Sequence, residues 1–508
     1  MSNYVRPGTY VEETLLPRSP EFSSSDSAAV FVASHGRGPE GPHLVQNWAD
    51  FARIYGGFPV KTSLLPHTLF QFFNNGGRDA YVIRVTGSGA SVSDASFDDR
   101  DTSAAEETLV FKSKDVGTWG NDVAISISDA GDDRFNVTVF YGGKARNNIV
   151  ERFLDVSMDP GDSRYVEAVI NSELVGSTYV EVSDSESSNQ DTIGYAGVRP
   201  VVTAGDPVAL TGGSNGADPE NTDFTDAIPL IEQIDRPWVA NFPGVSETTV
   251  INAAVTLAES TGLGFVVADT PPDLNAAGAV SYASGLQSSS YVATYWPYLR
   301  TSDAGSATRG SSRLMPPGGA VVGNYLATDA VTGPWKAPAG LGNSLAGVVG
   351  TERVVAHADL DLLSLGHVNP IRLFPGAGFV IWGSRTRKKA QTDKFVPVRR
   401  ALIYLAKSLR DSTAWVPFEA NDENLWRTVE STIESFLNGV WQLGGLRGRT
   451  PAEAFYVRCD STTNTAASIE AGQVNIEVGV AVQTPAEFVV IKLSQSEAGV
   501  SVDDIVSG

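Results

Sequence analysis

Short apolar runs alternate with amphipathic stretches through much of this 508-residue chain. Apolar runs of this kind are typical of strands buried on both faces, and they lie at 28–33, 80–85, 238–240, 265–268 and 291–296. The stretches between them repeat apolar residues at helical spacing and predict helices at 47–55, 64–74, 226–233, 246–260 and 276–286. Strands that alternate with helices indicate a mainly parallel sheet. We therefore predict a central α/β domain formed by residues 25–86 and 208–364.

Residues 87–207 interrupt this alternation and predict a separate, inserted domain. The stretch from Gly87 to Glu106 is rich in Ser, Asp, Ala and Gly, as linkers are. Beyond it, apolar residues recur at every second position, as at Val123, Ile125 and Ile127, which is the pattern of a half-buried strand. We expect a β-rich domain that flexible necks join to the α/β part.

Residues 365–493 predict an α+β domain. Two extended runs at 371–374 and 379–382 precede a helix with Pro397 in its first turn. On a helical wheel the apolar positions 398, 402, 405 and 409 share one side, and a separate arc carries the cations Arg399, Arg400, Lys407 and Arg410. A second amphipathic helix at 425–436 and an alternating stretch at 474–482 follow. The first helix is expected to pack inward by its Val and Leu residues and to point the four cations outward.

The region around this helix is basic within an acidic chain. Between Arg385 and Arg410 nine lysines and arginines stand against one acidic residue, Asp393, whereas the whole chain has a net charge of −22. One interpretation is a solvated face, and the other is a docking face for an acidic partner, either nucleic acid or protein. The overall negative charge argues against a general nucleic-acid binder, which needs a broadly basic surface.

Both ends of the chain predict extended arms. Residues 1–24 form an arm and linker, and residues 494–508 form a polar tail after a last strand. A strand at a terminus needs the edge of a sheet in its own chain or in a neighbour. The residues predicted to pair in this way are Thr9, Tyr10, Val11 and Glu12 near the start and Phe488, Val489, Val490 and Ile491 near the end.

Few residues point to catalytic chemistry. Ser214 lies in a G-x-S-x-G run, the spacing of a nucleophile elbow, but that motif needs a helix directly after the serine and here the helix is expected only near Phe224. Asp269 follows a strand, a common place for chemistry, yet no second carboxylate is spaced to pair with it, so we expect a turn or cap role. None of the five histidines lies in a recognisable protease motif.

Composition adds further bounds. Cys459 is the only cysteine, which excludes an intrachain disulfide or a cysteine-based metal cluster and suits a reducing cytosol. No apolar run approaches the roughly 20 residues that span a bilayer. The opening residues contain no apolar segment of a secretory signal. We predict no catalytic residue, no metal ligand, no cofactor and no direct membrane insertion.

Several short runs carry a family resemblance. They are Pro7-Gly8-Thr9-Tyr10-Val11-Glu12-Glu13, Asn369-Pro370-Ile371-Arg372, Trp382-Gly383-Ser384-Arg385-Thr386, Ala452-Glu453-Ala454-Phe455 and Pro485-Ala486-Glu487-Phe488-Val489-Val490. These runs resemble the tail sheath proteins of contractile-tailed bacteriophages and of related contractile injection machines.

The resemblance implies a structural, mechanical protein with no enzyme activity. Its subunits would stack as hexameric rings in a helical polymer around an inner tail tube protein, with baseplate and tail terminator proteins at the ends. The central domain would be subtilisin-like, the insert would face outward, and the basic helix would face the tube. The terminal strands would join neighbouring subunits. The particle would be a virion tail assembled in the host bacterial cytoplasm.

Other classes of protein stay open at this point. A hydrolase on the α/β domain would use Ser214 as its nucleophile, and a nucleic-acid binder would use the basic face. The same sequence runs also fit the sheath of a non-viral, headless injection system.

Overall fold

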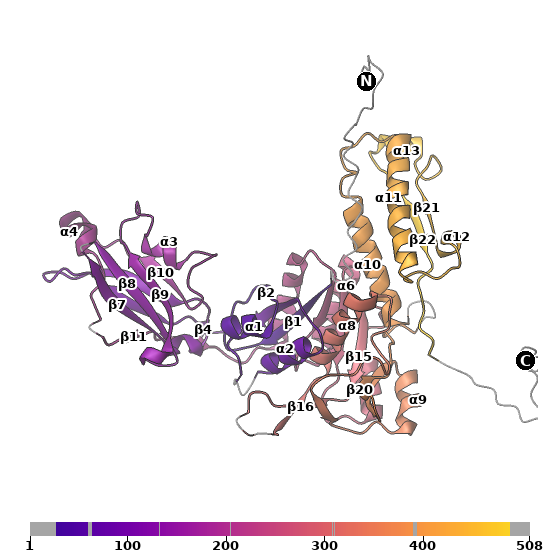
Figure 1. Cartoon of the computed structure of the whole chain (residues 1–508), viewed down its shortest axis with the longest axis horizontal. Coiled ribbons are helices and arrows are strands. Elements are labelled where there is room, and N and C mark those ends of the chain that lie inside the picture. Colours follow the sequence, from indigo (N-terminus) through magenta and orange to yellow (C-terminus); the bar gives the residue numbers. More distant parts are fainter. Residues whose placement is uncertain are drawn as a thin grey trace, which may run out of the picture.

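An eight-stranded sheet forms the centre of the molecule (Figure 1). The computed structural model describes residues 27–58, 63–131, 133–203, 205–306, 308, 310–389 and 394–487. In spatial order the strands are β2 (His43–Val45), β3 (Ala80–Val85), β1 (Ala28–Ser34), β13 (Trp238–Asn241), β14 (Gly264–Asp269), β15 (Val292–Trp296), β19 (Val368–Phe374) and β20 (Gly378–Ile381). The six inner strands are parallel, and β2 and β20 run antiparallel at the two edges. The predicted, mainly parallel α/β sheet is confirmed.

Helices cover both faces of this sheet, so its strands are buried on both sides. Along β1, Phe31 belongs to one apolar core and its neighbours Val30 and Val32 to the other. The first core also takes in α1 (Trp48–Tyr55), α2 (Leu65–Asn74) and α8 (Gly318–Thr332). The second takes in α5 (Asn221–Ala227), η3 (Ile228–Gln233) and α6 (Thr248–Thr261), while α7 (Ala276–Ser284) and α9 (His357–Leu365) form a smaller cluster beside the sheet.

The innermost helix, α8, is buried almost all round. Its residues from Gly318 to Leu326 are buried, as expected of a helix that is apolar on every side. Gly319 and Gly323, one turn apart, bring it close to α2, because a Cβ there would lie 2.5 Å from the Thr68 carbonyl oxygen and 2.4 Å from that of Phe72. A larger residue at either position would push the two helices apart.

The predicted boundary at residue 365 does not fall at the end of the sheet. β19 pairs with β15, and β20 pairs with β19, so the strands up to Ile381 continue the central sheet. The sequence placed these two strands in the C-terminal domain because they directly precede its first helix. A small sheet of β16 (Leu299–Ser302), β17 (Ser312–Met315) and β18 (Val348–Thr351) adjoins the α/β part.

The inserted segment folds as two sheets around one core (Figure 1, left). One sheet contains β5 (Asp94–Asp98), β6 (Glu107–Ser113) and β10 (Val180–Asp184), and the other contains β7 (Val123–Gly131), β8 (Arg134–Tyr141), β9 (Ile149–Val156) and β11 (Val208–Ala209). Short helices connect them: η1 (Thr118–Asp122), η2 (Arg146–Asn148), α3 (Val166–Ile170) and α4 (Gln190–Gly197). The expected β-rich composition is confirmed, and β11 extends the domain one strand past residue 207.

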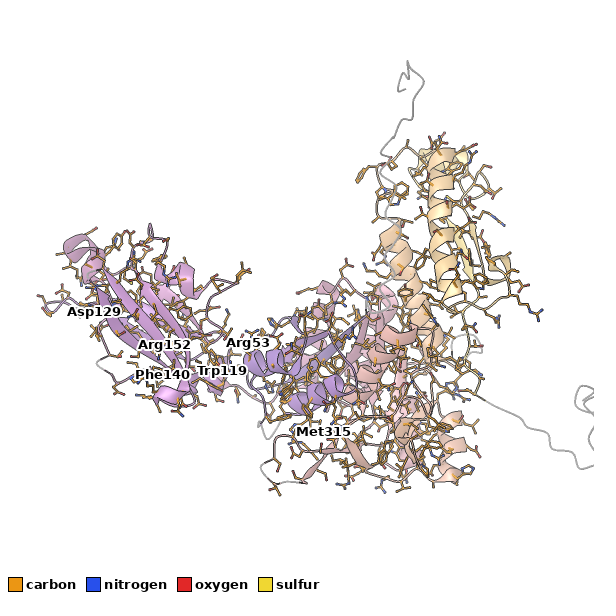
Figure 2. The ribbon with its side chains drawn as sticks, viewed as in Figure 1. Arg53, Trp119, Asp129, Phe140, Arg152 and Met315 are labelled. Atoms are coloured by element: carbon orange, nitrogen blue, oxygen red, sulfur yellow. The ribbon has the colours of Figure 1, made fainter. Side chains whose placement is uncertain are left out.

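The necks of the insert are ordered rather than flexible linkers. The two chain crossings pair as β4 (Ala90–Ser91) with β12 (Ser214–Asn215). Next to them, the guanidinium of Arg37, from the loop after β1, lies 4.7 Å from the ring centre of Trp119, 5.0 Å from Tyr141 and 4.5 Å from Tyr179. Figure 2 shows Trp119 at this junction, beside Arg53 of α1, whose carbonyl oxygen accepts a hydrogen bond from Arg37.

Arg84 adds a second link at the same junction. It donates to the carbonyl oxygens of Gly38 in the α/β part and of Val116 in the insert. Cation–π contacts strengthen when the cation is removed from water, and Arg37 is 5% exposed. The expectation of flexible necks is therefore wrong, because a buried arginine in an aromatic cage fixes the insert against the central sheet.

The last part of the chain is built around two long helices (Figure 1, upper right). They are α10 (Val396–Ser412) and α11 (Glu423–Gln442), and α12 (Pro451–Ala454), α13 (Ala466–Glu470), β21 (Phe455–Arg458) and β22 (Glu477–Val480) pack beside them. Val396 and Ile403 of α10 lie in a core of the central sheet, whereas Tyr404 and Leu405 lie in the core around α11. One helix is thus shared by two cores.

Candidate functional site: the basic helix and its partners

The helix α10 begins where the sequence predicts it. Phe395 is extended, and Pro397 occupies the first turn, where a missing N–H costs nothing. The helix ends at Ser412, five turns on, and is followed by an exposed loop. The four cations lie on α10 as predicted, but their side chains do not share one outward face.

Arg400 is buried, and its partner is a buried carboxylate. Its guanidinium donates from both Nη atoms to the two oxygens of Asp329 on α8, with 2.8 Å between Nη1 and Oδ1. The two side chains are 4% and 2% exposed. The Tyr325 ring lies 4.7 Å from the guanidinium carbon. Burial raises the pKa of Asp329, and the charge of Arg400 opposes that rise. The expectation that Arg400 points outward is wrong.

Lys407 is also engaged within the chain. Its Nζ donates to Asp411 at 2.7 Å and lies 3.1 Å from Asp235 in the α/β part. Burial lowers the pKa of Lys407, but the two carboxylates outweigh it and the pKa ends above its usual value. With a side chain 8% exposed, this residue does not face outward either. Lys407 therefore lies on the side of α10 that faces the central domain and not on the outward side.

Arg399 and Arg410 complete the predicted arc. Arg399 stacks on Tyr291 at 4.4 Å and donates to its hydroxyl at 3.2 Å, half-buried beside the central sheet. Arg410 is exposed, near the end of the helix. Of the four cations that were expected to form one outward face, Arg410 is the one that the structure leaves fully at the surface.

Three further cations of the basic run also have partners. Arg387 is buried and donates to the carbonyl oxygens of Gly366 and His367. Lys394 lies 4.8 Å from the ring of Phe395. Arg385 binds the carboxylate of Glu487. Most of the positive charge that stood out in the sequence is therefore used to fix the chain to itself.

The predicted arm strands cannot be placed. Thr9, Tyr10, Val11, Glu12, Phe488, Val489, Val490 and Ile491 lie outside the described residues. The alternating stretch at 474–482 is described, and it yields a shorter strand, β22, paired with β21.

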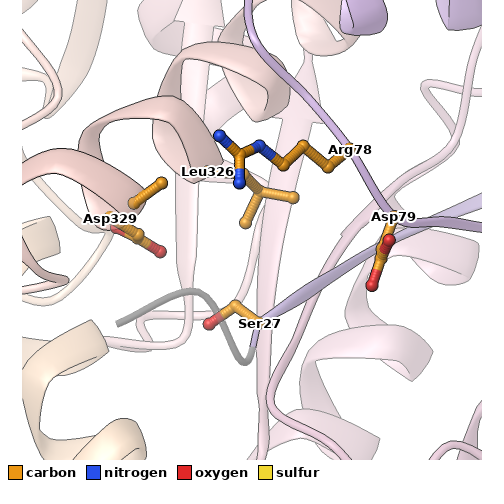
Figure 3. Close-up of a pocket in the computed structure, with 6 residues that line it drawn as sticks. Ser27, Arg78, Asp79, Leu326 and Asp329 are labelled. Atoms are coloured by element: carbon orange, nitrogen blue, oxygen red, sulfur yellow. The ribbon is translucent and has the colours of Figure 1, made fainter. Parts of the chain in front are cut away.

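A cavity of about 220 Å³ opens where β1 begins (Figure 3). Ser27, Arg78 and Asp79 line it from one side, and Leu326 and Asp329 of α8 from the other. Asp79 pairs with Arg236 at 2.9 Å. The carboxylate that binds Arg400 thus lines the same cavity as Ser27, the residue directly before β1.

The residues weighed for catalysis do not form a triad. Ser214 lies in β12 at the neck of the insert, and its Oγ accepts from the N–H of Gly216 at 3.1 Å. His35 contacts Ser63 and the carbonyl oxygen of Tyr55, and His67 contacts Asp303. No group of three or more His, Cys, Asp or Glu in the described ranges could hold a metal ion. No described helix has the length and apolar character of a membrane span.

Asp269 is a buried carboxyl at the start of α8, which agrees with the expected cap role. Its Oδ2 accepts from Asn241 Nδ2 at 2.8 Å, and the N–H of Gly318 at the start of α8 also donates to it. Burial raises the pKa of Asp269 to about 7, although both hydrogen bonds lower it. Burial therefore brings the pKa of this carboxyl close to neutral pH, which its position in the sequence did not indicate.

Two functional contacts were missed in the sequence. The Arg37 cage joins residues far apart in the chain and leaves no local pattern. Asp329, by contrast, did leave a signal, because it is the one charged residue in the helix Gly318–Thr332. A lone carboxylate in an otherwise buried helix needs a cationic partner.

Comparisons with known proteins place this chain. Residues 388–495, which include α10, α11, β21 and β22, match the model of the phage tail sheath C-terminal domain. These residues are therefore similar to the C-terminal domain of phage tail sheath proteins. A tail sheath protein of Vibrio phage KVP40 is 32% identical over 165 residues, which span 31% of this chain and 23% of that relative. These matches are to structural sheath proteins and not to enzymes.

The whole chain has the fold of sheath subunits. It matches the sheath in the contracted state of an extracellular contractile injection system, PVC, with a TM-score of 0.61 and 19% identity, covering 98% of this chain and 99% of the other. The contracted helical sheath of the anti-feeding prophage gives 0.60 and 20%, covering 97% and 100%. A sheath tail protein from Listeria innocua gives 0.61 and 12%, covering 90% and 95%. The sheath resemblance is confirmed.

Proposed function

We propose that this protein is the structural subunit of a contractile tail sheath, in a phage tail or in a phage-like injection particle. The observation that carries the proposal is the match of the fold over nearly the full length of sheath subunits, together with the sheath family match of the C-terminal domain. The central domain, the insert and the C-terminal domain would be the three functional parts of the subunit.

Assembly would follow the sheath pattern. Subunits would form stacked hexameric rings around an inner tube, between baseplate and terminator proteins, and contraction would drive the tube through a target envelope. Thr9–Glu12 and Phe488–Ile491 would add strands to the sheets of neighbouring subunits. Each added backbone hydrogen bond contributes about 1 kcal/mol net, so short strands repeated over many subunits keep a polymer joined. The subtilisin likeness of the central domain and assembly in a bacterial cytoplasm remain predictions.

The tube contact needs revision from the form that the sequence suggested. Arg400 and Lys407 are occupied inside the subunit, so the proposed tube-facing charge on α10 reduces to Arg410, with Arg399 beside the central sheet. An exposed ion pair contributes only about 0.2–1 kcal/mol. Such a contact could form in an extended sheath and break when the sheath contracts.

The test of the function is electron microscopy of the purified protein, alone and mixed with tube protein. Rings or tubes of regular width are the expected result. Deletion of residues 1–15 should give folded subunits that do not polymerise. Particles that stay single at every concentration, with and without tube protein, would contradict the proposal.

The tube contact has its own test. Arg410→Glu should weaken sheath assembly on tubes and leave the subunit folded, whereas Arg427→Glu, on the exposed face of α11, is the matched control. Reversal of Arg400 is unsuitable, because a glutamate there would be buried against Asp329 and would unfold the subunit before any tube contact was tested.

A further inference from the structure

A bidentate ion pair joins the end of the described chain to the central sheet. Arg385 Nε donates to Glu487 Oε1 at 2.8 Å, and Arg385 Nη2 donates to Oε2 at 2.6 Å. The two residues are 102 positions apart. Their side chains are 14% and 20% exposed, so water screens the pair only in part. The two parallel bonds match the planar fork of an arginine to a carboxylate, which a lysine cannot reproduce.

Arg385 is fixed in place by groups other than Glu487. Its backbone N–H donates to Asn369 Oδ1 at 2.7 Å, and its carbonyl oxygen accepts from Asn369 Nδ2 at 2.8 Å. Asn369 belongs to β19 and is 1% exposed. The third guanidinium nitrogen, Nη1, donates to the carbonyl oxygen of Ser364 at 2.7 Å. The fork that receives the carboxylate is therefore preorganised by the edge of the sheet and by α9.

The pair lies in a groove between β19 and α9 at the edge of the central sheet. The groove has a volume of about 390 Å³, and Leu360, Ser364, Pro370 and Trp382 line it together with the segment Pro485-Ala486-Glu487. Before this point the chain is held once more, because Arg447 donates its N–H to the carbonyl oxygen of Ala481. Val482 also bridges to Leu446, and Gln483 Nε2 donates to the Leu446 carbonyl oxygen at 3.4 Å. Residues 484–486 thus run between this attachment and the Arg385–Glu487 pair at the central sheet.

We propose that Arg385 is the anchor of the C-terminal arm: it binds Glu487 and so fixes the point on the central domain from which residues 488–508 leave the subunit. The inference rests on the proposed function, in which Phe488–Ile491 pair with a neighbouring subunit. The strand that follows Glu487 directly would then start from a defined place on the central domain. A fixed start limits the volume that the strand explores and raises its effective concentration at the neighbour.

The experiment measures the anchoring contact and polymer assembly separately. A nitroxide label is attached to the full-length protein at Thr484→Cys, an exposed position between the two attachments, while the native Cys459 is buried. Label mobility is measured by electron paramagnetic resonance in dilute, unpolymerised protein. Glu487→Gln and Arg385→Lys should both mobilise the label, and the exchange of both residues, Arg385→Glu with Glu487→Arg, should restore much of the order. Glu477→Gln is the control, because it removes an exposed pair with Arg458 on the hairpin.

Polymer formation is measured on the same variants by sedimentation. Glu487→Gln should raise the subunit concentration needed for polymerisation about tenfold, because the arm is released from its start, and Glu477→Gln should leave it unchanged. Unchanged label mobility in Glu487→Gln and Arg385→Lys would overturn the anchor. A mobile label with unchanged polymerisation would overturn its role in assembly. If the parent protein never polymerises while its label responds as expected, the anchor stands and the proposed function fails.

Discussion

Replacement of Arg400 by methionine tests whether α10 is fixed to the central domain by its buried ion pair. Methionine keeps much of the side-chain length and removes the charge, which leaves the Asp329 carboxyl buried without its partner. Removal of one member of a buried pair typically costs about 3–5 kcal/mol. The loss should be at the upper part of that range, because the contact with the Tyr325 ring disappears as well.

The cost should depend on pH in a defined direction. Burial already raises the pKa of Asp329, and removal of Arg400 takes away the charge that opposes this rise. The pKa of Asp329 in the folded variant is then above its unfolded value, so stability is retained at low pH and lost as pH rises through the folded pKa. One pKa unit corresponds to 1.36 kcal/mol. The cost of the substitution is therefore larger at pH 8 than at pH 5, where protonation of Asp329 recovers most of the lost stability.

The assay is urea unfolding at pH 5 and pH 8, followed by tryptophan fluorescence and by hydrogen exchange of α10. Because α10 belongs to two cores, Arg400→Met should also separate the unfolding of the C-terminal domain from that of the central domain. Arg410→Met, on the same helix but exposed, should change stability by less than about 0.5 kcal/mol. A loss below about 1 kcal/mol at pH 8, or an equal loss at both pH values, would refute the reasoning.

Three further predictions follow from the structure. Asp269→Asn should gain stability over the parent as pH rises from about 4 to 7, by up to about 4 kcal/mol, because the pKa of Asp269 is raised to about 7 in the fold; parallel pH profiles from denaturant unfolding would contradict this. Arg37→Ala should open the neck of the insert to limited proteolysis while the insert itself stays folded, and Trp119→Leu should do the same; necks as resistant as those of the parent would argue against the cage. Ser214→Ala should leave assembly and stability unchanged, and the loss of any esterase or peptidase turnover in that variant would instead support a hydrolase.

Local patterns were sufficient to locate most of the elements. The helix predicted at 47–55 is α1 with Asn47 as its cap, and the strand predicted at 28–33 is β1. Both depend on residues close together in the chain, so propensity and periodicity identify them. The boundary at 365 failed for the opposite reason, because β19 is placed by its pairing with β15, more than seventy residues earlier. Nothing near residue 365 records that partner.

The direction of the cations on α10 failed in a similar way. A helical wheel assumes one buried side, yet Val396 and Ile403 pack on one core and Tyr404 and Leu405 on another. A helix that packs against two cores has little solvent-exposed surface. An arginine on the side that the wheel shows as outward can therefore be buried when a buried carboxylate pairs with it. Asp329, the one charged residue of α8, was the available signal that such a partner exists.

These contacts also bear on how a sheath subunit could move. Arg400 and the two cores of α10 join the C-terminal helices to the central sheet, and Arg37 with Arg84 joins the insert to the same sheet. Each link is buried, and breaking the Arg400–Asp329 pair alone would cost about 3–5 kcal/mol, far more than an exposed pair at a subunit surface. A change in packing between subunits is therefore expected to leave the described body rigid.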